Sequence, residues 1–388
     1  MQFSRLGNRN SLCLAVLLIL ICLATFDDAS RALSRGSIQE KVGQWNPRNT
    51  GADVQFVGDQ VCAQCHLRVI ESYSQSPMRM AIESVGESRV LMANPVLSFR
   101  NGPYLYLIKR KDKQSFYTVS DGKGSITVSI LYAFGRGKAG QTYVFQNESE
   151  LYESRVSFYK DIAGLDLTVG TANKVPASLK EALGRRLSED ETKNCFICHS
   201  GKSMSGGKIN LEKVGPGIRC ETCHGPGGSH VDAVQLGEPG RNLIFNPNRL
   251  GGDELSQDFC AACHRPNNDF EKMRSLQTNN VRFQPYRIFY SKCYSDDRRI
   301  SCTACHNPHE PVKEDTAYYD AKCLACHTVQ SRKNGRPNST DQGSAISCKV
   351  ATKDCVSCHM QKIGPVQTHF KFTDHYIRVV KSGAAYPK

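Results

Sequence analysis

The pentapeptide Cys220-Glu-Thr-Cys-His224 is the stretch that decides how this chain folds. Two cysteines separated by two residues and followed at once by histidine occur seven times in the 388 residues. The seven copies are Cys62/Cys65/His66, Cys195/Cys198/His199, Cys220/Cys223/His224, Cys260/Cys263/His264, Cys302/Cys305/His306, Cys323/Cys326/His327 and Cys355/Cys358/His359. They use most of the 18 cysteines and 11 histidines of the chain.

Each residue of this motif has a chemical task. Two thiols at this spacing add across the vinyl groups of haem, and the adjacent imidazole becomes the proximal iron ligand. A single cysteine pair is also typical of a zinc knuckle or a redox dithiol, but neither needs a histidine after every second cysteine. The pattern therefore predicts haem c, seven groups in all, covalently attached outside the cytoplasm.

The four histidines outside the motifs are the first candidates for the sixth ligands of the irons. They are His230, His309, His369 and His375. His309 lies three residues after His306, too close in the chain to reach the opposite face of the same iron, so it is expected to ligate a neighbouring haem. The same argument applies less strictly to His230, six residues after His224.

Four histidines cannot serve seven irons. Met78 and Met80 follow the first motif and are candidates for a thioether ligand, which would raise that haem's potential relative to a bis-histidine neighbour. Met204, Met360, a lysine or water are left for the other irons. An open position on any of them would be a place for substrate.

The stretch between His66 and Cys195 contains neither cysteine nor histidine, so it cannot attach haem. Five segments in it are apolar or alternate apolar and polar residues, and they predict strands of a small antiparallel sheet. These segments are residues 104–109, 115–119, 125–134, 142–146 and 154–159. Gly135, Gly137 and Gly140 match a dinucleotide-binding pattern, but no helix follows them, which favours a hairpin loop.

The N-terminus and the charge indicate the compartment and the partners. Arg5 and Arg9 precede an apolar run over residues 12–24, so residues 1–29 are expected to form a signal peptide or an N-terminal anchor. We therefore expect a periplasmic or extracellular protein. A membrane tether through the N-terminus and an oligomeric state are both left open by the sequence. The net charge of +13 comes from scattered basic residues, which favours redox partner proteins over nucleic acid. Cys293 and Cys348 lie outside the motifs, and a disulfide between them is expected in an oxidising compartment.

Longer matches surround several motifs. Residues 56–66 read FVGDQVCAQCH, residues 220–230 read CETCHGPGGSH, residues 302–309 read CTACHNPH and residues 355–360 read CVSCHM. In these segments the chain resembles the multihaem cytochrome c superfamily that includes the ammonia-oxidiser tetrahaem cytochrome c, hydroxylamine oxidoreductase and pentahaem nitrite reductase. The resemblance implies that the four histidines outside the motifs are distal ligands, and that Met78 stands where many relatives have a ligand histidine.

Two departures from these relatives weaken the case for catalysis. The catalytic haem of the nitrite reductases requires Cys-x-x-Cys-Lys, whereas all seven motifs here end in histidine. The tyrosine cross-link of hydroxylamine oxidoreductase cannot be assigned to any tyrosine of this chain. We therefore expect a heptahaem electron-transfer protein, and as the alternative an oxidoreductase acting on a small nitrogen or sulfur compound at a five-coordinate haem.

The expected fold is a mostly α and irregular multihaem cytochrome c fold, organised around stacked haems, with a small antiparallel β insert. Residues 50–92 are expected to form the first haem-binding segment. The haem-free β-rich insert is expected over residues 95–172, and a hexahaem domain over residues 173–388. In the haem-binding parts, the macrocycles would replace much of the side-chain interior.

Overall fold

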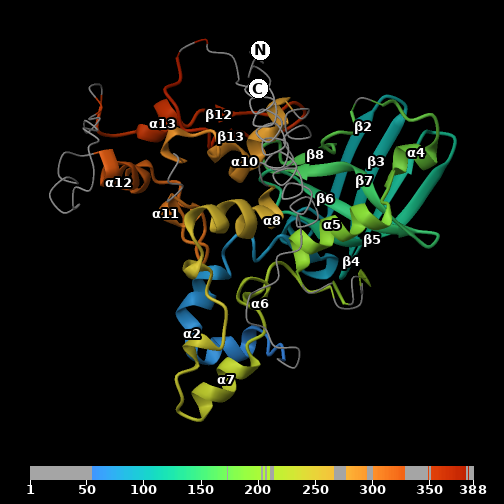
Figure 1. Cartoon of the computed structure of the whole chain (residues 1–388). Coiled ribbons are helices and arrows are strands. Elements are labelled where there is room, and N and C mark those ends of the chain that lie inside the picture. The colour runs from blue at the N-terminus through green and yellow to red at the C-terminus, as the bar shows by residue number, and fades with distance from the viewer. Residues whose placement is uncertain are drawn as a thin grey trace, which may run out of the picture.

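The computed structural model describes residues 55–172, 174–201, 204–205, 208–209, 214–265, 277–294, 300–327, 348, 351–381 and 383. The expected signal segment, residues 1–29, lies outside them. A large antiparallel sheet stands beside a group of short helices and loops (Figure 1). The expectation of a mostly α and irregular fold with a small β insert is wrong, because this sheet has nine strands and is the largest regular unit described.

The sheet is built almost entirely from consecutive antiparallel neighbours. Its strands follow the order β2-β3-β4-β5-β6-β7-β8, with β1 paired to β5 and β9 paired to β7. The end strands β2 and β8 contact each other, so the sheet curls round one interior. The strands are β1 (Ile82–Ser84), β2 (Val96–Asn101), β3 (Tyr104–Lys111), β4 (Gln114–Ser120), β5 (Ser125–Phe134), β6 (Gln141–Asn147), β7 (Glu150–Tyr159), β8 (Gly164–Leu167) and β9 (Gly184–Arg186). The five predicted strand segments fall within β3 to β7 and are confirmed.

Alternating side chains build the interior of this sheet, as the period of two in a strand requires. Along β3, Tyr104, Tyr106 and Ile108 are buried, and the residues between them are more exposed. Tyr117 of β4 continues the row, with its ring centre 6.5 Å from that of Tyr106 and 5.7 Å from that of Phe145. The segment therefore has an apolar core of its own and needs no haem to bury its side chains. With nine strands, the sheet is larger than the expected insert.

The loop between β5 and β6 contains the three glycines of the dinucleotide-like pattern. Gly135, Gly137 and Gly140 all have positive φ angles, 87°, 81° and 125°. A Cβ atom at Gly135 would lie 2.6 Å from the carbonyl oxygen of Gly140, so the turn accepts only glycine there. Since β5 and β6 pair antiparallel, the prediction of a hairpin loop is confirmed.

The helices are short and lie mainly on the other side of the molecule. They are α2 (Asp59–Tyr73), α3 (Arg89–Ala93), α4 (Leu179–Leu183), α5 (Glu189–Ser200), α6 (Cys220–His224), α7 (Gly228–Gln235), α8 (Ala261–His264), α10 (Gln284–Ile288), α11 (Cys302–Cys305), α12 (Thr316–His327) and α13 (Cys355–His359). The π-helical turn η6 (Glu254–Cys260) precedes α8. Two small hairpins, β10 (Met204–Ser205) with β11 (Lys208–Ile209) and β12 (Lys362–Ile363) with β13 (Phe372–Thr373), complete the described elements used below.

The helical part is elongated. In Figure 1, α2 and α7 lie at its lower end and α12 and α13 at its upper end, with η6 and α8 between them. Within the described residues, no helix combines the length and the apolar character needed to cross a membrane.

Candidate haem-attachment sites

Every one of the seven motifs includes a turn of helix. The first lies in α2, the second ends α5, the third is α6, the fifth starts α11, the sixth ends α12 and the seventh is α13. The fourth spans the junction of η6 and α8. Residues i, i+3 and i+4 share one face of a helix, so each turn brings both thiols of a motif to the same side as its histidine or close to it.

The motifs lie next to one another in an order that differs from their order in the chain. First-cysteine thiols lie close enough to shift each other's pKa in three pairs, namely Cys62 with Cys220, Cys260 with Cys302 and Cys323 with Cys355. Cys223 is near Cys260, and Cys305 is near Cys323. These contacts join the motifs in the order first, third, fourth, fifth, sixth and seventh. The second motif joins from the side, because Cys198 lies beside the fourth motif, with its thiol 3.8 Å from the carbonyl oxygen of Ala262 and near Cys263.

The second cysteine is more exposed than the first in four of the motifs. Cys65, Cys263, Cys326 and Cys358 are exposed, whereas the first cysteine of each of their motifs is partly buried beside another motif. Cys326 is near Cys293, which lies outside the motifs. The two cysteines of a motif are three positions apart, which is about 4.5 Å along a helix. Each second thiol therefore lies almost one turn away from the neighbouring motif that covers the first thiol. Haem attachment through these four exposed cysteines remains a prediction.

Two carboxylates hold the first and third motifs together. Glu221, inside the third motif, accepts from the backbone N–H groups of Val57 and Gly58 at 2.8 and 2.9 Å and from that of Gly227 at 3.0 Å. In the other direction, Asp59 of α2 accepts from the backbone N–H of Cys220 at 3.4 Å. Burial is the main cause that raises the pKa of the Cys220 thiol to about 12, and the Asp59 carboxylate adds to it.

A carboxylate in the same position joins the sixth and seventh motifs. Asp320 of α12 is buried and accepts from the backbone N–H groups of Asp354 and Cys355 at 2.7 and 2.8 Å. Burial raises the pKa of the Cys355 thiol to about 12, with the Asp320 carboxylate as the next cause. Asp59 and Asp320 were not predicted from the sequence, although both stand three residues before a first cysteine, in DQVCAQCH and DAKCLACH.

Three pairs of histidine rings lie at the separation that a shared iron requires. A metal-bound imidazole nitrogen is about 2 Å from the metal and the ring centre about 1 Å further, so ligands on opposite sides have ring centres about 6 Å apart. The pairs are His66 with His230 at 6.4 Å, His224 with His309 at 5.8 Å and His306 with His375 at 6.1 Å. Each pair combines a motif histidine with one from outside the motifs, so the residues fit haem with two axial imidazoles at the first, third and fifth motifs.

The placement of His309 and His230 follows the arrangement expected for cross-ligation. His309 lies beside His224 of the third motif, although it follows His306 of the fifth in the chain. His230 follows the third motif and lies beside His66 of the first. The role of these residues as iron ligands remains a prediction.

Backbone carbonyl groups orient several of these rings. The Nδ1 atoms of His199, His224, His230, His359 and His375 lie 2.8–3.0 Å from carbonyl oxygens of Ala81, Phe245, Gly240, Arg378 and Thr373. A ring that donates from Nδ1 keeps the lone pair of Nε2 for a metal. Burial also lowers the pKa of His199, His306 and His309, and that of His375 to about 4, which favours the neutral form that binds metals.

A buried ion pair fixes the segment that carries His375. Arg287 of α10 donates from Nε and Nη2 to the two carboxylate oxygens of Asp374, at 2.8 and 2.9 Å. Arg378 donates to the same carboxylate at 2.8 Å, and Ser291 donates to the His375 carbonyl at 2.7 Å. The last residues of the described chain are thus tied to α10 and the turn after it on both sides of His375.

His369 and Met78 have different surroundings. The Nε2 atom of His369 lies 2.8 Å from Oδ2 of Asp166 in β8, and its ring centre lies 4.7 Å from that of Tyr159. Its metal-binding nitrogen therefore faces a carboxylate in this arrangement. Met78 lies in the turn after α2, where its carbonyl accepts from the N–H of Ile218 at 2.9 Å. Ligation by either residue remains a prediction, as does a disulfide between Cys293 and Cys348.

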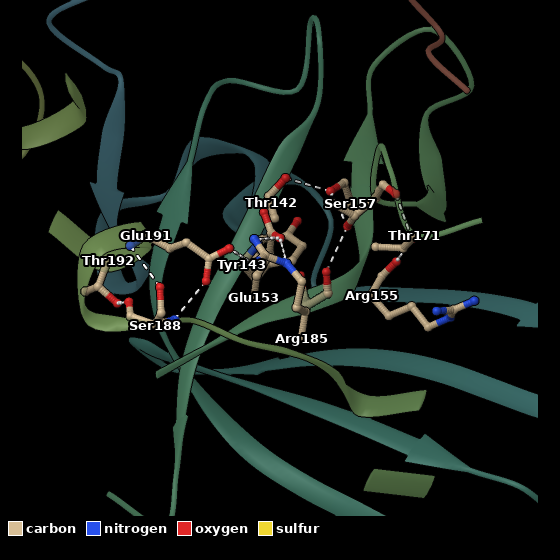
Figure 2. A network of polar contacts seen from close by, with 12 residues as sticks. Thr142, Tyr143, Glu153, Arg155, Ser157, Thr171, Arg185, Ser188, Glu191 and Thr192 are labelled. Atoms are coloured by element: carbon tan, nitrogen blue, oxygen red, sulfur yellow. Dashed lines mark hydrogen bonds and ion pairs between the residues drawn. The ribbon is translucent and has the colours of Figure 1, made fainter. Parts of the chain in front are cut away.

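The second motif is attached to the sheet. Phe196 of α5 is fully buried, with its ring centre 5.2 Å from those of both Tyr132 and Phe134 of β5. The start of α5 is held by a capping box between Ser188 and Glu191, which is linked through Arg185 to Glu153 of β7 (Figure 2). The sheet therefore positions the turn that carries Cys195, Cys198 and His199.

Comparisons with known proteins agree with these sites. A family described as "Cytochrome c554 and c-prime" matches residues 167–225, which include the second and third motifs. A multiheme cytochrome, MtrA, from Shewanella baltica (strain OS185) is 21% identical over 228 residues, which are 50% of this chain and 62% of that protein. These matches support a multihaem cytochrome c. The chain thus matches somewhat less than two thirds of this curated relative's length.

A solved structure also aligns with this chain. The crystal structure of the outer cell wall cytochrome OcwA aligns over 84% of this chain and 80% of that chain, with a TM-score of 0.46 and 16% sequence identity.

Proposed function

We propose that this cytochrome carries seven haem c groups and transfers electrons along its row of attachment sites, in the periplasm or at the cell surface. The observation that carries the proposal is the closeness of the thiols of neighbouring motifs, which places six sites in a row with the second site beside the fourth. When bound, each haem would supply a one-electron iron couple.

The residues of the chain would do three things in this function. The paired cysteines would fix each macrocycle, and the motif histidines would bind its iron from one side. His230, His309 and His375 would bind from the other side at the first, third and fifth motifs, which keeps those irons closed to substrate. Carboxylates and carbonyl groups hold these side chains in place, so little rearrangement would accompany a change of iron charge.

Three features support the proposed compartment and partners, namely the site of haem attachment, the pattern of the N-terminal residues and the net charge. Haem is attached to such motifs outside the cytoplasm, and the N-terminal residues have the pattern of an export signal. The net charge of +13 would be offset in part by haem propionates, leaving a surface suited to acidic redox proteins.

The haem count of the matured protein tests the proposal. Intact mass and the alkaline pyridine spectrum of the purified chain should both give seven haems, and a redox titration should show them all reversible. A colourless protein, or one whose mass equals that of its amino acids, would refute the proposal. A variant with Cys302→Ala and Cys305→Ala should lose one haem and retain six.

The contact of His369 favours a second function, an oxidoreductase with an open iron. Three motif histidines have a partner histidine at axial separation among the described residues, and the fourth histidine outside the motifs is hydrogen-bonded to Asp166. Low-temperature paramagnetic resonance separates the two functions. A high-spin signal that changes with nitrite, hydroxylamine or sulfite would support the oxidoreductase, and its absence would leave the electron carrier.

A further inference from the structure

The same link between two motifs, made by an aspartate and called a joint below, occurs twice in the row of sites. Asp59 and Asp320 each stand three residues before the first cysteine of their own motif, and each accepts from the backbone N–H of the first cysteine of a second motif. In both places the two first-cysteine thiols also lie near each other, Cys62 near Cys220 and Cys323 near Cys355. Two unrelated stretches of chain therefore reach the same arrangement through the same residue type.

The pair in the middle of the row lacks this carboxylate. Cys260 and Cys302 also lie near each other, but the residue three positions before Cys260 is Gln257, whose side chain donates to the carbonyl of Pro285 at 2.9 Å. Cys302 instead lies 3.6 Å from the hydroxyl of Ser256. The residue three positions before the first cysteine of the fourth motif therefore carries no charge.

The two aspartates differ in their counter-charges. Asp59 pairs with Arg219 at 2.6 Å and with Arg79 at 3.5 Å, so cations neutralise it. Asp320 is 7% exposed and accepts from backbone N–H groups; within the described ranges it forms no ion pair. Its pKa is lowered, chiefly by the N–H of Cys355, so it is ionised at neutral pH. A buried charge without a partner acts strongly on its neighbours.

We propose that Asp59 and Asp320 are equivalent positioning residues that join two haem sites into a pair, and that the charge of Asp320, which no cation among the described residues offsets, makes the sixth and seventh sites the low-potential end of the row. The inference rests on the proposed function. Thioether formation removes the proton from each sulfur, so the backbone amides remain as donors to the carboxylate. A fixed negative charge beside both attachment points stabilises the oxidised iron at each.

Asp320→Asn tests this, because it removes the charge and keeps the shape of the acceptor. The matched control is Asp258→Asn, which removes an exposed carboxylate two residues before Cys260. The matured proteins are compared by intact mass, by mass mapping of haem peptides and by optical redox titration. We expect Asp320→Asn to favour reduction of the lowest-potential haems at least threefold, about 28 mV at 59 mV per tenfold for one electron. Asp258→Asn should change this by much less.

Each outcome of the Asp320→Asn experiment supports or contradicts the inference. A seven-haem Asp320→Asn protein whose titration matches that of Asp258→Asn would overturn the charge inference and leave the proposed function intact. Haem loss confined to the sites of Cys323 and Cys355, restored together with the low potential in Asp320→Glu, would support the joint. Haem loss spread evenly over all seven sites would contradict a local joint, and absence of haem from the unaltered protein would refute the proposed function itself.

Discussion

The buried ion pair between Arg287 and Asp374 gives a quantitative prediction. Arg287 is 1% exposed and Asp374 is fully buried, and two hydrogen bonds of 2.8 and 2.9 Å join them. Removing one partner of such a pair costs about 3–5 kcal/mol, because the other charge stays buried. Arg378 keeps its own 2.8 Å hydrogen bond to Asp374, so we expect Arg287→Met to cost about 3 kcal/mol, at the lower end of this range.

Amide hydrogen exchange measures this cost where it falls. The N–H of Asp374 donates to the carbonyl of Gln361, and that of Ile377 donates to the Ser291 hydroxyl, so both should be protected. A loss of about 3 kcal/mol should speed their exchange by roughly 150-fold, at 1.36 kcal/mol per tenfold.

The control is an exposed ion pair in the same chain. Arg185 is 48% exposed and pairs with Glu153 and Glu191, so Arg185→Met should cost less than about 1 kcal/mol in its own region. Exchange in residues 361–378 of Arg287→Met that is accelerated less than threefold would refute the reasoning.

Three further predictions concern packing, acid stability and the β5–β6 loop. Phe196→Ala should cost about 3–5 kcal/mol, seen as a lower melting temperature by circular dichroism, because the ring is fully buried against β5. Burial acts to raise the pKa of Asp374, but Arg287 holds it below its usual value. The contribution of the ionised carboxylate to stability should therefore be complete above about pH 4 and disappear as the pH falls through the lowered pKa. Amide exchange of residues 361–378 that is equally slow at pH 7 and pH 2, after correction for intrinsic rates, would contradict this. Gly135→Ala should destabilise the sheet by about 1–3 kcal/mol more than Gly122→Ala in denaturant unfolding, because both have positive φ but only Gly135 faces a carbonyl oxygen at 2.6 Å.

The sequence predicted the central strands well, because their alternation is long and clear. Residues 104–109 and 125–134 match β3 and β5 to within two residues. The short strands β1 and β9 were not predicted, since Ile82–Ser84 and Gly184–Arg186 hold too few residues to show a period, and their pairing with β5 and β7 depends on the finished sheet. The size of the sheet was underestimated for the same reason.

The motifs themselves could be found from the sequence, but their neighbours could not. A Cys-x-x-Cys-His turn is a local pattern, whereas the closeness of Cys62 and Cys220 depends on how the whole intervening chain folds. The spacing of His306 and His309 showed only that the two should not share an iron. It held no information that His309 would lie beside His224.

The self-contained sheet also bears on how the row of sites assembles. Asp59 and Cys220 meet although 161 positions separate them in the chain, and most of the residues between lie in the span of the sheet, from the start of β1 to the end of β9. Once the sheet has folded, only about a third of that length remains as free tether, which lowers the entropic cost of closing the loop by about 1 kcal/mol. During maturation, the folded sheet would thus bring an early segment of the chain back to a late one before the macrocycles can hold them together.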